Sequence, residues 1–108
     1  MESNIFNSLF VVLMRLVFLW VMSKTAFAAD TEKGGELYAI HCASCHGAAG
    51  AAVMLNAPSF DQGDSLLQAD AALLKTIKNG KNAMPSYQGI LGDRDIIDVV
   101  AYLRTLPN

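Results

Sequence analysis

The chain has 108 residues, a length that predicts a single domain within it. Its formal net charge of −2 excludes the strongly basic surface on which nucleic-acid binding depends. Hydrophobic residues make up 53% of the sequence, and they are concentrated near the N-terminus.

The N-terminal segment has the pattern of an export signal. Residues 9–22 read LFVVLMRLVFLWVM, an apolar run interrupted only by Arg15, and a short polar stretch follows it. Residues 26–28 then form the A-x-A pattern that precedes a signal-peptide cut. We therefore expect a signal peptide over residues 1–28, and cleavage after Ala28 would leave a mature chain of residues 29–108.

The alternative is an uncleaved membrane anchor. Ile5 to Met22 is about 18 residues, just long enough to cross a bilayer. Arg15 near the middle of that span would cost roughly 2.5–3.5 kcal/mol on insertion scales. The charge favours a cleaved signal, and membrane association is expected only if the segment is retained.

Residues 29–108 are predicted to form a small helical domain. A first helix is expected from Thr31 to Ser44, with Thr31 as its N-cap. Gly34 and Gly35 are poor helix formers. They indicate either a place where another helix approaches closely or a frayed first turn.

The end of the first predicted helix overlaps Cys42-Ala43-Ser44-Cys45-His46, a C-x-x-C-H motif typical of covalent haem c attachment. On a helical turn, Cys42 and Cys45 face the same side, so both sulfurs can form thioethers with the two porphyrin vinyl groups. His46 follows directly and can place its imidazole under the iron.

Three other interpretations of the cysteines compete with haem attachment. A thioredoxin-like redox pair needs a neighbouring βαβ pattern, which the sequence lacks. A zinc site normally takes four ligands, and His41 is too close to the motif for these residues to enclose one ion. A structural disulfide remains a possible interpretation for an exported protein, but His46 directly after the second cysteine favours haem.

Two more helices are expected towards the C-terminus. One fits Ala71 to Asn79, capped by Asp70 and stopped by Gly80, with a short helical turn before it at residues 65–68. The other has Asp93 as N-cap and runs from Arg94 to Thr105; its apolar residues follow the spacing of a buried helix face. No alternating strand pattern is present, which predicts an all-α fold.

The mature chain contains two methionines that could supply a sulfur ligand to haem iron. Met54 lies only eight residues after His46, in a loop on the same side of the iron. Met84 lies in the turn-rich stretch of residues 79–85, where Pro85 restricts it to extended conformations. We expect Met84 to be the sixth ligand; its alternative role is ordinary core packing.

Taken together, these features resemble the class I c-type cytochromes. The resemblance covers the whole mature chain and rests on the C-x-x-C-H motif and on weaker features in the correct order. Those features are Gly34 and Tyr38 before the motif, Pro58 twelve residues after His46, Met84-Pro85, and Val99-Val100-Ala101-Tyr102-Leu103.

The resemblance implies a cytochrome c fold, with three to four helices around one covalently attached haem. It implies that Gly34 and Tyr38 pack against Val99 and Tyr102 where the first and last helices cross. The carbonyl of Pro58 would accept the Nδ1–H of His46, unless Pro58 is an ordinary loop proline. Phe60 would pack on the haem, and Tyr87 would close the Met84 side.

A haem iron bound by His46 and Met84 predicts a periplasmic one-electron carrier, a monomer with transient redox protein partners, and no enzymatic activity. One alternative is a five-coordinate haem with Met84 displaced, although no distal His or Arg is evident. The other is a dedicated cytochrome subunit of a larger oxidoreductase or of a membrane-anchored complex.

Overall fold

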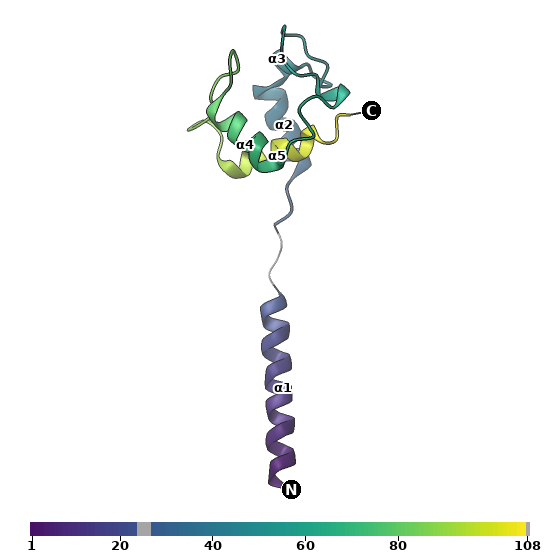
Figure 1. Cartoon of the computed structure of the whole chain (residues 1–108), viewed down its shortest axis with the longest axis vertical. Coiled ribbons are helices and arrows are strands. Elements are labelled where there is room, and N and C mark those ends of the chain that lie inside the picture. The colour runs from purple at the N-terminus through teal and green to yellow at the C-terminus, as the bar shows by residue number, and fades with distance from the viewer. Residues whose placement is uncertain (24–26, 108) are drawn as a thin grey trace.

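The computed structural model describes residues 1–23 and 27–107, and these residues form helices and loops without a β-strand. The predicted all-α fold class is confirmed. The elements are α1 (Glu2–Met22), α2 (Thr31–His41), α3 (Ala43–His46), the 3₁₀ turn η1 (Phe60–Gln62), α4 (Asp70–Asn79) and α5 (Asp93–Leu103). Figure 1 shows α2 to α5 gathered into one body, with α1 extending away from it.

Helix α1 makes no contribution to the core. None of its 21 residues is buried, and the helix is long and apolar enough to cross a membrane. A signal sequence has the same length and composition, so α1 is compatible with either prediction for this segment. Of the proposed cleavage motif, Ala26 lies outside the described residues.

The first helix of the domain is shorter than predicted. Asp30, rather than Thr31, is the N-cap of α2, since its carboxylate accepts the N–H of Lys33 at 3.0 Å. The helix ends at His41 instead of continuing to Ser44, and Cys42, with φ −119° and ψ −33°, is a turn residue that joins it to the next element. A separate single turn, α3, begins at Ala43.

The predicted N-caps of the last two helices are also wrong by one residue. Ala69 and Gly92 precede α4 and α5, and the carboxylates of Asp70 and Asp93 are used in ion pairs instead. Asp70 binds the Arg104 guanidinium, and Asp93 lies 2.8 Å from the Lys78 ammonium. An N-cap carboxylate would accept a backbone N–H of the first helical turn. Here each carboxylate instead binds a cation from a distant part of the chain.

Two details near these helices also differ from the prediction. Residues 65–68 form hydrogen-bonded turns rather than a helical segment. Helix α5 ends at Leu103, two residues earlier than expected. Gly80 stops α4 as predicted.

Helix α5 is the centre of the domain and packs against both α2 and α4. The core consists of aromatic and aliphatic side chains from all parts of the body: Tyr38, Phe60, Leu66, Leu73, Ile77, Leu91, Ile96, Val99, Val100 and Leu103. This core positions the segments that carry the candidate site.

The crossing of α2 and α5 has the contacts that the resemblance implied. A Cβ built on Gly34 would lie 2.0 Å from the carbonyl oxygen of Asp98, so the two backbones touch at this point. The rings of Tyr38 and Tyr102 are 5.3 Å apart between centroids. Gly34 is therefore a close-approach glycine and not part of a frayed turn.

Candidate haem-binding site

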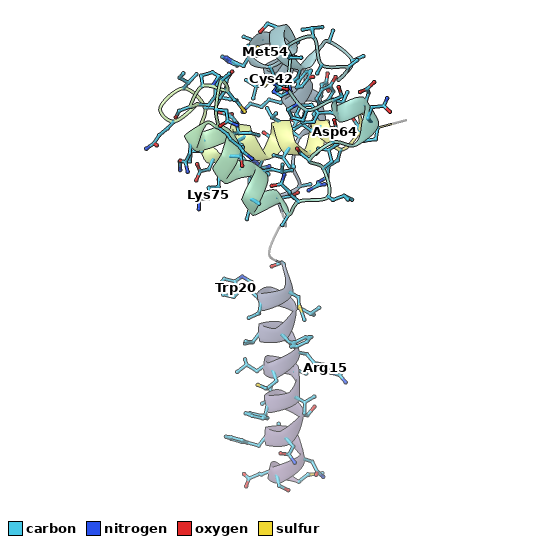
Figure 2. All side chains as sticks on the ribbon, turned by 45° about the horizontal axis from the view of Figure 1, so that its top comes forward. Arg15, Trp20, Cys42, Met54, Asp64 and Lys75 are labelled. Carbon is cyan, nitrogen blue, oxygen red and sulfur yellow. The ribbon has the colours of Figure 1, made fainter. Side chains whose placement is uncertain are left out.

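The C-x-x-C-H motif is folded as one tight turn at the junction of α2 and α3. The Cys42 N–H still bonds to the Tyr38 carbonyl of α2 at 2.8 Å, and the His46 N–H bonds to the Cys42 carbonyl at 2.9 Å. The sulfurs of Cys42 and Cys45 are not joined in a disulfide. Figure 2 shows Cys42 at the end of the body remote from α1.

Gly47 ends this turn immediately after the histidine. Its φ of +82° is unfavourable for residues with a side chain, and a Cβ would lie 1.9 Å from the Ala51 carbonyl oxygen. The Gly47 carbonyl accepts the hydroxyl of Tyr38 at 2.7 Å, a buried hydrogen bond between α2 and the end of the motif. Tyr38 and Gly47 together fix where His46 points.

The Tyr38 hydroxyl should make stability depend on alkaline pH. Burial, reinforced by the nearby Cys42, raises the pKa of Tyr38 to about 12. In the unfolded chain the phenol ionises near pH 10, so stability is present below that pH and is lost as pH rises towards 12. Urea unfolding of Tyr38→Phe should show a flatter dependence over this window, and a loss of about 1 kcal/mol at pH 7. An unchanged alkaline slope would contradict this role.

The imidazole of His46 is held in one orientation by two neighbours. Its Nδ1 lies 3.2 Å from the Pro58 carbonyl oxygen, and its ring stacks on Phe60 with centroids 4.6 Å apart. A carbonyl can only accept, so Nδ1 must carry the proton, which leaves a free lone pair on Nε2. The buried histidine therefore presents Nε2 as a metal ligand.

The environment of the cysteines argues against redox-active thiols. Burial, with a smaller effect from Cys45, raises the pKa of Cys42 to about 11. A catalytic C-x-x-C pair instead has a lowered thiol pKa, because the thiolate is the nucleophile. Within the described part of the chain, no group of three or more His, Cys, Asp or Glu side chains could hold a metal ion.

Met84 lies in the loop between α4 and α5, and the loop has a defined shape. Lys81 and Met84 exchange two backbone hydrogen bonds of 3.1 and 2.9 Å. Gly80 permits this return of the chain, since its φ is +75° and a Cβ would lie 2.7 Å from the Met84 carbonyl oxygen. The Met84 side chain is partly buried against the core.

Met54 is placed differently. Its backbone N–H bonds to the Cys45 carbonyl at 3.0 Å, so the residue belongs to the same segment as His46. Its side chain is 44% exposed, and Figure 2 shows it at the same end of the body as Cys42. Met54 thus lies in the loop that follows the motif.

The donor set fits haem c. Two cysteines without a disulfide lie three residues apart on a tight turn, and a buried imidazole offers Nε2 directly after them. A thioether is available from a separate, hydrogen-bonded loop. An all-α body with these features defines a protein of the c-type haem class.

Comparison with known proteins agrees with this class. Residues 29–103 match the model of the family described as cytochrome c oxidase, cbb3-type, subunit III. Cytochrome c6 of Pyropia yezoensis is 35% identical over 86 residues, which cover 75% of this chain and 76% of that protein. For cytochrome c6 of Synechococcus sp. the identity is 37% over 86 residues, covering 76% and 75%. The structure of cytochrome c6 from the diatom Phaeodactylum tricornutum aligns with a TM-score of 0.61 at 28% identity, covering 71% of this chain and 93% of that one.

The chain belongs to the family of small class I c-type cytochromes. It binds one haem c covalently through Cys42 and Cys45, and it is an electron-transfer protein rather than an enzyme. The predicted cytochrome c fold is confirmed.

Sequence reasoning missed the roles of several residues around the motifs. Gly47 was not singled out, although a glycine directly after the histidine was the available signal; Gly80 was predicted to stop α4, but its close contact with the Met84 backbone was not. The sequence gives no indication of the hydrogen bond made by the Tyr38 hydroxyl, because this bond depends on how α2 packs against the end of α3.

Proposed function

We propose that the mature domain is a periplasmic carrier that takes one electron from one redox protein and passes it to another. In this proposal His46 and Met84 would be the two side chains of the protein that hold the iron. The haem, when bound, supplies the one-electron change between ferrous and ferric iron. With both ligands supplied by the protein, that change would need little ligand exchange.

The observation that carries the proposal is the orientation of His46. The Pro58 carbonyl at 3.2 Å holds the Nδ1 proton, and Phe60 supports the ring face. Such a bond raises the basicity of the ligating nitrogen and keeps the imidazole from rotating. We assign Pro58 and Phe60 to the haem site on these contacts.

The arginines of the domain are committed elsewhere, which argues against peroxide chemistry at the iron. The Arg94 guanidinium lies 3.5 Å from the buried carboxylate of Asp98. Arg104 binds Asp70 and donates to the Leu66 carbonyl at 2.6 Å. A peroxide-activating haem would use such a cation beside the bound oxygen.

The test of the proposed function is a redox titration of the exported protein. We expect one reversible one-electron step at a positive potential, and no catalytic current when hydrogen peroxide is added. Thioether ligation and an apolar surround both favour the ferrous state, which is the reason for the positive value. A catalytic peroxide current from the intact protein would contradict the proposal.

A second candidate is a membrane-held cytochrome subunit of a larger oxidoreductase. It is favoured by α1, whose 21 residues are apolar and unburied. The mature N-terminal residue separates the two candidates. The carrier should begin at Ala29 in a periplasmic extract, whereas an anchored subunit should keep residues 1–28 and remain with the membranes.

The carrier is expected to act as a monomer. Redox partners of such carriers dock weakly, through interfaces at the small end of the known range, because electrons must be delivered and the complex released quickly. The net charge of the proposed mature chain, with six Lys and Arg against nine Asp and Glu, is −3 and excludes nucleic acid as a partner.

A further inference from the structure

The Met84 loop is attached to the body by two sets of hydrogen bonds with different consequences. The first set joins the loop to the end of α4. The Ser86 hydroxyl and the Gln88 N–H donate to the Lys78 carbonyl at 2.7 and 3.1 Å, and the Tyr87 N–H donates to the Ile77 carbonyl at 3.3 Å. These bonds use helix-end carbonyls that lack partners within α4. They fix the shape of the loop on its own helix.

The second attachment is a single bond to a different helix. The Tyr87 hydroxyl donates to the carbonyl of His41, the last residue of α2, at 2.7 Å. The His41 ring also meets the Tyr87 ring edge-on, with centroids 5.8 Å apart. Within the described part of the chain, this is the one hydrogen bond between the loop after α4 and α2.

The acceptor of this bond lies directly beside the haem attachment. His41 precedes Cys42, and Cys42 carries one of the two thioethers. Tyr87 lies three residues after Met84. The bond therefore ties the loop that carries the methionine to the segment that is covalently joined to the haem.

The surroundings of the Tyr87 hydroxyl favour its protonated form, which is the hydrogen-bond donor. Tyr87 is partly buried, and burial raises the pKa of its phenol above the ordinary value. The carbonyl at the end of α2 has no helical partner, so the bond satisfies an acceptor that would otherwise need water. Removal of the hydroxyl alone would leave the ring contact with His41 in place.

We propose that Tyr87 is a positioning residue, whose hydroxyl bond to His41 keeps the Met84 loop beside the haem whether or not the sulfur is bound to iron. The inference rests on the proposed ligation by Met84. A tethered sulfur has a high effective concentration at the iron. Met84 would therefore compete well against an external ligand, and the tether would favour electron transfer over ligand binding.

The test is the affinity of the ferric holoprotein for imidazole, a small ligand that competes with a methionine sulfur. Tyr87→Phe removes only the hydroxyl and should tighten imidazole binding about three- to tenfold, the range for loss of one hydrogen bond. Tyr102→Phe is the matched control. Its hydroxyl makes no hydrogen bond within the described residues, and imidazole affinity should equal that of the wild type.

The outcomes distinguish this inference from the proposed function. Both variants should keep the weak far-red absorption band that reports sulfur ligation of ferric haem. If Tyr87→Phe keeps that band and binds imidazole as the wild type does, the tether is refuted while ligation by Met84 stands. If Tyr87→Phe is merely less stable to urea at unchanged imidazole affinity, the hydroxyl is structural and the inference fails. If the wild type lacks the band, the proposed ligation itself is wrong.

Discussion

Met84→Ala is expected to convert the saturated haem into one that binds external ligands. Alanine offers no donor atom, and the loop would still be held at Lys78 and His41. The ferric protein should lose its far-red band, and the ferrous protein should bind carbon monoxide readily. The midpoint potential should fall by on the order of 0.1 V, within the roughly 0.8 V over which axial ligands set haem potentials.

Met54→Ala is the matched control, because it removes the other methionine of the mature chain. Met54 is tied to the Cys45 carbonyl and its side chain is half-exposed, so its loss should leave the spectrum and the potential unchanged. Absorption spectra with and without carbon monoxide compare the two variants. Loss of the far-red band in Met54→Ala, with its retention in Met84→Ala, would reverse the assignment.

Gly34→Ala is expected to destabilise the domain strongly, because it places a methyl group in the contact between α2 and α5. The new Cβ would lie 2.0 Å from the Asp98 oxygen and 3.0 Å from the Val99 nitrogen, and both atoms belong to the α5 backbone. This clash is removed only if α5 moves away from α2. Overpacking of this kind lowers the free energy of unfolding by about 3 kcal/mol. The gain in helix propensity offsets only about 1 kcal/mol of that cost.

Gly35→Ala tests whether the close approach, rather than helix propensity, is responsible. A Cβ at Gly35 would meet the side chain of Tyr102 at 3.0 Å, and a partly exposed ring can shift where a backbone cannot. Urea unfolding should place Gly35→Ala within about 1 kcal/mol of the wild type. Equal destabilisation of both variants would show that the α2–α5 contact is not the cause.

The features nearest to the chemistry could be predicted from the sequence because their geometry is local. The C-x-x-C-H spacing confines two sulfurs and an imidazole to one turn, whatever the rest of the chain does. Gly34 could be given two interpretations, and only the position of the Asp98 carbonyl decides between them. The all-α class followed from the spacing of apolar residues on the last helix.

The helix ends were predicted less well, because caps compete with distant partners. Asp70 and Asp93 are good N-cap residues by local rules, yet Arg104 and Lys78 take their carboxylates. The break at Cys42 had no local signal, since the residues around it tolerate a helix. The Tyr87–His41 bond joins residues 46 positions apart and could be found only in the folded chain.

The most direct test of the account is the absorption spectrum of the purified wild-type protein, oxidised, reduced, and reduced under carbon monoxide. Haem held by an imidazole and a thioether predicts sharp reduced bands, a weak far-red band in the oxidised form, and no change on adding the gas. A reduced spectrum that shifts at once under carbon monoxide, or an oxidised spectrum without the far-red band, would contradict it.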